Sequence, residues 1–162
     1  MFTAQDIFDI AIRLENNAEK TYREAQQHTT DERLKALLDW IADEEHNHAG
    51  WFTALKENLA NDENSHLMAD LSQALVEDVV QGQAFSLQEV DFRAIDTPDR
   101  MIRTFIGFED DTIAFYQVLK ALVEDPELLI QLDQIITEEL KHIAKFREVL
   151  TVSEPTMTGP TV

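Results

Sequence analysis

The sequence predicts an all-α protein: a bundle of four long helices with a long helical crossover between the second and the third. Glycine and proline number only four each among 162 residues, whereas residues that favour helices, such as Leu, Ala, Glu and Gln, are abundant. Apolar residues also recur at alternating spacings of three and four over long stretches, which is the period of a helix that buries one face in a bundle.

Residues typical of helix starts divide the chain. Thr29 is a candidate N-cap with Glu32 three residues later, and Thr97 and Asp125 each precede a proline at the first helical position. The predicted helices cover residues 3–27, 30–60, 98–123 and 126–150. Because the connections within the first pair and within the last pair are short, each pair is expected to form an antiparallel hairpin.

Residues 61–97 connect the two hairpins and are too long for a simple turn. Within them, residues 65–81 predict an amphipathic helix that ends near Gly82. A helix of this length spans roughly 25 Å, which with its flanks carries the chain between opposite ends of a bundle. Residues 1–150 are therefore expected to form one domain, and residues 151–162, which lack an apolar period, a flexible tail.

The composition excludes several classes of function. Lys and Arg total 13 against 32 Asp and Glu, a net charge of −19, which argues against binding to nucleic acid or to an anionic membrane. The absence of cysteine excludes disulfides, thiolate-bound zinc and iron–sulfur centres. Neither a signal peptide nor an apolar run long enough to span a membrane is visible, so a cytoplasmic location is expected.

Each predicted helix has a glutamate in the middle of its apolar face, and in two helices a histidine follows three residues later. The six residues are Glu15, Glu45, His48, Glu109, Glu139 and His142. An unpaired buried carboxylate costs several kcal/mol, and a fold that is only ~5–15 kcal/mol stable cannot hold four of them without compensation. Because no Lys or Arg lies on these faces, the compensating charge is expected to come from two divalent metal ions.

An internal repeat supports this interpretation. Glu15, Tyr22, Glu45 and His48 recur as Glu109, Tyr116, Glu139 and His142, always 94 residues later, and the two tyrosines are the only ones in the chain. The pattern indicates two copies of a helix with one glutamate followed by a Glu-x-x-His helix, related by a pseudo-twofold axis.

The spacing explains how these residues could bind metal. Residues three apart share one face of a helix, so each Glu-x-x-His pair can hold one ion, while Glu15 and Glu109 complete the coordination. Two of the four carboxylates are then expected to bridge the ions, as in di-metal carboxylate bundles. Oxygen and nitrogen ligands without thiolate suit iron or manganese, and zinc is possible in the same site.

The chain resembles the rubrerythrin (erythrin) family over about residues 3–150, and the paired Glu-x6-Tyr motifs are its most specific marks. The motifs are Glu15 with Tyr22, Asp43-Glu44-Glu45-His46-Asn47-His48-Ala49, Glu109 with Tyr116, and Glu138-Glu139-Leu140-Lys141-His142. The resemblance implies a ferritin-like four-helix bundle, paired as a homodimer, whose two iron ions react with hydrogen peroxide or dioxygen in oxidative-stress defence. It also implies a peroxidase or ferroxidase type of reaction and an external electron donor such as a rubredoxin.

This sequence differs from that family at two points that affect the predicted ligand set and the source of electrons. Rubrerythrins carry a further glutamate one turn after the ligand of the third helix, where this chain has Thr112, and they have an iron–sulfur tail that this chain, without cysteine, lacks. The ligand set is therefore six residues. Three other functions remain open: a subunit of an iron-storage assembly, a protein like manganese catalase, and a helical module without catalysis.

The tyrosines are the candidate catalytic residues outside the ligand set. Helical side chains lean toward the N-terminus, so Tyr22 and Tyr116 are expected to hydrogen-bond to Glu15 and Glu109 on their own helices and to quench radicals. By contrast, Glu44 and Glu138, next to the ligands, are interpreted as part of a solvated face.

Overall fold

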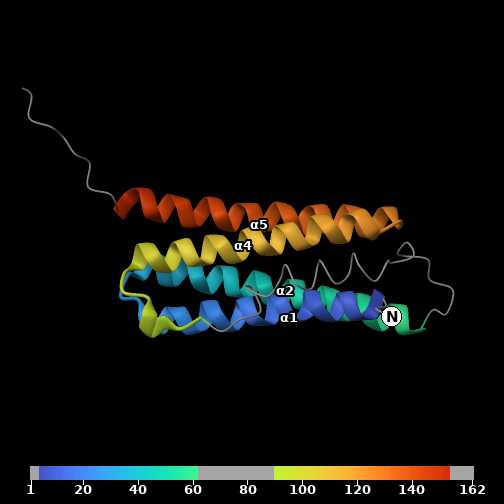
Figure 1. The fold of residues 1–162 in the computed structure, drawn as a ribbon, viewed down its shortest axis with the longest axis horizontal. Coiled ribbons are helices and arrows are strands. Elements are labelled where there is room, and N and C mark those ends of the chain that lie inside the picture. The colour runs from blue at the N-terminus through green and yellow to red at the C-terminus, as the bar shows by residue number, and fades with distance from the viewer. Residues whose placement is uncertain (1–3, 62–89, 154–162) are drawn as a thin grey trace, which may run out of the picture.

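The computed structural model describes residues 4–61 and 90–153. They form the helices α1 (Ala4–Ala25), α2 (Glu32–Asn61), α4 (Pro98–Leu122) and α5 (Pro126–Ser153), with short 3-10 turns η1 (Gln26–His28) and η2 (Phe92–Ala94). The four long helices lie lengthwise beside one another, with α1 packed on α2 and α4 on α5 (Figure 1). The predicted all-α bundle of two hairpins is therefore confirmed. None of the described helices is both long and apolar enough to cross a membrane.

The ends of two helices differ from the prediction. The first α-helix ends at Ala25, and η1 takes the next three residues; the last helix continues to Ser153, so residues 151–153 are not part of a tail. Thr151 lies within this last turn and donates a hydrogen bond to the Glu148 carbonyl at 2.9 Å. The helix can extend this far because the next proline is Pro155, which disfavours helical backbone only at the residue before it. The predicted helix 65–81 and residues 154–162 lie outside the described residues.

The predicted caps of the second hairpin are confirmed, but the cap of α2 is not. Thr97 Oγ1 accepts a hydrogen bond from Arg100 N at 3.2 Å, and Asp125 Oδ1 accepts one from Leu128 N at 2.8 Å. At α2, however, Asp31 Oδ1 accepts from Arg33 N and Leu34 N, and Thr29 only supports Asp31 by accepting its backbone N–H. Asp31 rather than Thr29 caps the helix because its negative charge also interacts favourably with the helix dipole.

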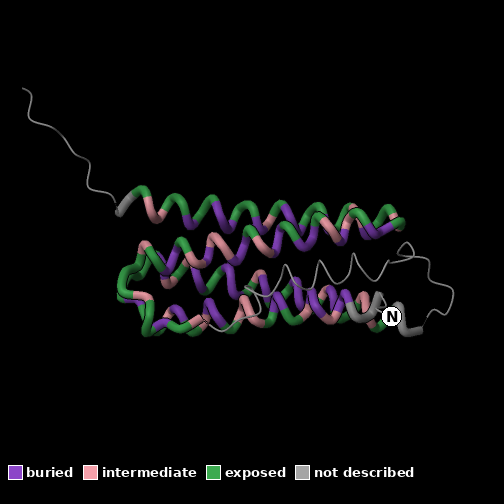
Figure 2. The backbone as a smooth tube through the Cα atoms, viewed as in Figure 1, coloured by how far each residue is buried: buried purple, intermediate pink, exposed green. Residues whose placement is uncertain are grey.

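The core consists of two apolar clusters separated by one polar layer. In Figure 2 the buried residues of the helices face the inside of the bundle. Along α1, Phe8 and Leu14 belong to one cluster, Tyr22 and Ala25 to the other, and Glu15 follows directly after the first. In each of the other long helices the glutamate likewise lies between residues of the two clusters, and along α2 and α4 the clusters come in the reverse order. The predicted metal ligands of all four helices therefore lie at the same level of the bundle, between two apolar layers.

The corrected cap of α2 can be tested by mutation. Asp31→Ala should lower the free energy of unfolding by about 1 kcal/mol because two backbone N–H groups lose their acceptor. In the matched control Glu32→Ala, the lost residue is exposed and forms a surface ion pair with Lys35, so the loss should be no more than about 0.5 kcal/mol. Urea unfolding measures both losses. A larger loss for Glu32→Ala than for Asp31→Ala would favour the Thr29–Glu32 capping box that the sequence predicted.

Candidate metal centre

The structure brings all six predicted ligands together in the polar layer. They come from all four long helices, and none is more than 5% exposed: Glu15, Glu45, His48, Glu109, Glu139 and His142. The surrounding layers are apolar on both sides, and aromatic rings border the cluster. Phe52 stacks on Tyr116 with centroids 5.3 Å apart, and Phe146 packs on Tyr22 at 6.0 Å. Most of the surface of these six ionisable side chains is thus shielded from water.

The ligands form two groups that share two members. One group is Glu15, Glu45, His48 and Glu139, and the other is Glu45, Glu109, Glu139 and His142; within each, one ligand atom from every residue lies within 4.8 Å of the others. Each group could hold one ion. The two shared residues, Glu45 and Glu139, come from the two Glu-x-x-His helices, and they would be the carboxylates that contact both ions, a role that the sequence left unassigned.

The two oxygens of each shared carboxylate face different histidines. In Glu139, Oε1 lies 3.0 Å from His48 Nδ1 and Oε2 lies 2.9 Å from His142 Nδ1. In Glu45, Oε2 lies 3.4 Å from His48 Nδ1 and Oε1 lies 3.5 Å from His142 Nδ1. A carboxylate that divides its oxygens in this way is placed to bridge two ions.

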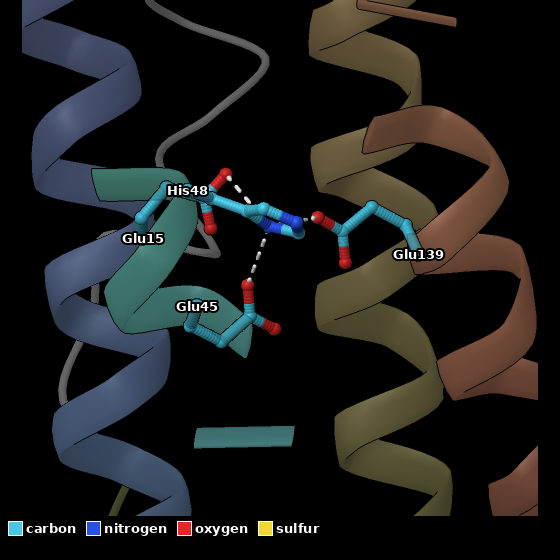
Figure 3. Close-up of side chains that lie close together, drawn as sticks. All are labelled: Glu15, Glu45, His48 and Glu139. Atoms are coloured by element: carbon cyan, nitrogen blue, oxygen red, sulfur yellow. Dashed lines mark ion pairs between the residues drawn. The ribbon is translucent and has the colours of Figure 1, made fainter. Parts of the chain in front are cut away.

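Figure 3 shows one of the two groups. The His48 ring, carried by α2, lies between the carboxylates of Glu15 on α1, Glu45 on its own helix and Glu139 on α5. The ring nitrogen that faces them is Nδ1. The equivalent nitrogen of His142 faces the other group, with Glu109 Oε1 at 3.6 Å.

The buried polar atoms test whether a metal pair fits. Among the described residues, the buried side-chain atoms without a hydrogen-bond partner are both oxygens of Glu45 and of Glu139, the Nδ1 atoms of both histidines, and His142 Nε2 on the outer side of its ring. All of these except His142 Nε2 face the inside of the layer. Native proteins rarely leave such atoms unsatisfied, and each one costs about 1–3 kcal/mol. These atoms converge on common points, and the donor set of carboxylate and imidazole suits Fe or Mn, so the residues fit two divalent ions.

The electrostatics show what the cluster does without metal. Burial, together with the charges of Glu45 and Glu139, raises the pKa values of Glu15 and Glu109 well above the usual range. Burial opposes the charged form of His48, but its contacts with Glu139 and Glu45 outweigh this and raise its pKa to about 12. The pKa of His142 is raised for similar reasons. Protons therefore take the place of metal charge in the metal-free protein.

One acidic residue beside the ligands was misjudged from the sequence. Glu138 is not merely solvated, because its Oε2 lies 2.8 Å from His48 Nε2 and forms a hydrogen bond with it. The corresponding distance from Glu44 Oε2 to His142 Nε2 is 3.6 Å, which is too long for a hydrogen bond. An outer partner such as Glu138 orients a metal-binding imidazole and fixes which nitrogen faces the ion. The signal was present in the sequence, since Glu44 and Glu138 are also 94 residues apart and so belong to the repeat.

The tyrosines hydrogen-bond to ligand carboxylates, but to those of the opposite hairpin. Tyr22 OH donates to Glu109 Oε1 and Tyr116 OH donates to Glu15 Oε1, so the expected pairing within each helix is wrong. Seven residues of helix rise about 10.5 Å, which is beyond the reach of a phenol, whereas the adjacent helix offers a carboxylate at the right level. Burial, with the nearby glutamates, raises both tyrosine pKa values, so both phenols remain proton donors.

A comparison with models of known protein families identifies the family of this chain. Residues 3–152 match the family model of the ferritin-like domain. The chain belongs to this ferritin-like domain family. Its fold is similar to that of a Thermotoga maritima protein described as a ferritin-like diiron-carboxylate protein, with a TM-score of 0.67 and 24% identity over 94% of this chain and 97% of that one. No curated protein matches the sequence.

The division into bridging and terminal ligands predicts how many ions each variant binds. Glu139→Gln should weaken the binding of both ions because it alters a shared carboxylate. The matched variant Glu15→Gln should weaken the binding of only one ion, since the ligand group that contains Glu109 and His142 remains complete. Titration calorimetry with Co²⁺ measures this. Two intact ion sites in Glu139→Gln would contradict the assignment.

The raised pKa values predict an unusual pH dependence for the metal-free protein. Its folded state holds more protons than the unfolded chain, so its stability should fall as pH rises from about 5 to about 9. The contribution of His48 is complete below its unfolded pKa of 6.5 and is lost as pH rises toward about 12; that of Glu15 and Glu109 is complete below 4.5 and is lost above it.

Melting temperatures of chelator-treated protein across this pH range provide the measurement. Metal ions displace the same protons, so their stabilising effect should grow as pH rises. The pKa of Glu139 is lowered to about 2 despite its burial, because both histidines contact it. Its contribution to stability therefore changes only below pH 4.5, outside the tested range. A melting temperature of the metal-free protein that rises with pH would contradict the proton assignment.

Proposed function

We propose that this chain is a di-iron oxidoreductase of the peroxidase or ferroxidase type. The observation that carries the proposal is the buried layer of six candidate ligands. In this layer Glu45 and Glu139 each direct one oxygen to His48 and the other oxygen to His142. When bound, a pair of Fe²⁺ ions supplies the two electrons that, with two protons, reduce one hydrogen peroxide to two water molecules. Dioxygen is the alternative oxidant.

The chain's own residues would prepare this chemistry. Glu45 and Glu139 would hold the two ions at a fixed separation, and Glu15 with His48, and Glu109 with His142, would complete the two coordination sets. The phenols of the two tyrosines donate hydrogen bonds to the terminal carboxylates and so keep them oriented. The apolar layers keep bulk water away from the site along the bundle axis, which strengthens electrostatic interactions within it.

The resemblance to rubrerythrin supports the finer parts of the proposal. It favours peroxide as the oxidant, an external donor such as a rubredoxin, a homodimer and a cytoplasmic role in oxidative-stress defence. An external donor also agrees with the absence of cysteine from these 162 residues, which therefore hold no iron–sulfur centre that could restore Fe²⁺. Thr112, buried one turn after Glu109, stands where rubrerythrins have a further ligand, so the centre is proposed to keep both ions in fixed positions.

Anaerobic loading with Fe²⁺ followed by rapid mixing with peroxide tests the reaction. We expect two Fe²⁺ to be consumed per chain and per peroxide, faster than free Fe²⁺ under the same conditions. Glu139→Gln should lose this advantage, whereas the exposed control Glu148→Gln should keep it. Dioxygen in place of peroxide identifies the preferred oxidant.

The same experiment separates the other functions. Oxidation of many Fe²⁺ ions per chain would favour an iron-storage assembly, and oxygen release from peroxide by the Mn-loaded protein alone would favour a catalase. If neither wild-type metal form reacted faster than free ions, the oxidoreductase proposal would be wrong.

A further inference from the structure

The two halves of the centre have equivalent ligands but different surroundings. Trp40 and Gln134 are related by the same offset of 94 residues as the ligands. The Trp40 indole meets the His142 ring edge-on, with centroids 5.4 Å apart and an interplanar angle of 89°. His142 is fully buried beneath this contact. An edge-to-face contact holds the imidazole where it is, because the ring cannot turn outward without displacing the indole.

The His48 half has an open pocket, with Gln134 in its lining, at the position equivalent to the Trp40 cover. The pocket has a volume of about 270 Å³ and lies between α2 and α5 beside the ring of His48. Its other lining residues are Asn47, Trp51, Gln131, Gln134, Ile135 and Glu138. A water molecule occupies about 30 Å³ in the liquid, so the pocket is large enough to admit a hydrated ion or the imidazole itself.

The lining of the pocket suits a divalent cation. Asn47, Gln131 and Gln134 offer amide oxygens, and the half-exposed carboxylate of Glu138 leads from the pocket to His48 Nε2, 2.8 Å away. Oxygen donors of this kind bind hard divalent ions weakly enough to release them. The net charge of −19 attracts cations and repels anions, so an anionic ligand does not suit this pocket.

We propose that divalent metal ions enter and leave the centre through this pocket, passing from Glu138 to the position of Glu15 and His48. The opposite position, of Glu109 and His142, keeps its ion because Trp40 locks the histidine in place. The two ions therefore exchange at different rates although their ligands are equivalent. This inference rests on the proposed two-ion centre.

Release of Co²⁺ to a chromogenic chelator tests the inference without any turnover. Protein loaded with two Co²⁺ per chain should release them in two phases of equal amplitude. Gln134→Trp places the missing cover on the open half and should slow the fast phase, and Trp40→Gln removes the existing cover and should speed the slow phase. Each change should be about tenfold, which is what one aromatic contact allows.

Tryptophan fluorescence assigns the phases to positions. The chain has two tryptophans, so Trp51→Phe leaves Trp40, beside His142, as the only tryptophan, which excitation at about 295 nm selects over the tyrosines. Bound Co²⁺ quenches a nearby indole, and the emission of Trp40 should recover mainly in the slow phase. If Gln134→Trp fails to fold, as judged by circular dichroism, this measurement and Trp40→Gln still decide the matter.

The outcomes separate the two proposals. A chain that binds no Co²⁺ would contradict the two-ion centre and this inference with it. Two ions that leave in a single phase, or a Trp40 emission that recovers in the fast phase, would overturn the inference alone. Two phases that respond to the substitutions as described would support both.

Discussion

The structure depends on the neutralisation of four buried carboxylates that lie at one level of the bundle. Each helix places its glutamate between two apolar stretches, so the two hydrophobic clusters cannot pack without bringing Glu15, Glu45, Glu109 and Glu139 together. The cost of burying them uncompensated would approach the whole stability of a domain. Protons meet this requirement in the metal-free protein, and the unsatisfied atoms of the layer are arranged so that two divalent ions can meet it instead.

This constraint explains why so much of the site could be predicted from the sequence. A glutamate on an apolar helical face has few structural explanations, and four of them in register with two histidines define a layer. What the sequence did not predict depends on contacts between helices. The tyrosines pair across the bundle because the glutamate of the adjacent helix is nearer than the one on their own helix. That Glu45 and Glu139 face both histidines, and so could contact both ions, follows from the side-chain directions of two facing helices. The cap at Asp31 was missed because two adjacent residues could each begin the helix.

The repeat has a second consequence, which concerns function. It duplicates the ligands, the tyrosines and the outer glutamates, but not the residues over the two histidines, where one copy has Trp40 and the other Gln134. Phe52 and Phe146 are also 94 residues apart and pack on Tyr116 and Tyr22, so the aromatic packing of the tyrosines is duplicated as well. The uneven cover of the two histidines is the feature on which the proposed passage of ions rests.

The most direct test of the central claim is a crystal structure of the iron-loaded protein with anomalous diffraction data collected at the iron absorption edge. The account predicts two anomalous peaks within the polar layer, both flanked by Glu45 and Glu139, with His48 at one and His142 at the other. A well-ordered structure in which the six side chains surround no metal peak, and instead hydrogen-bond to one another or to water, would contradict it.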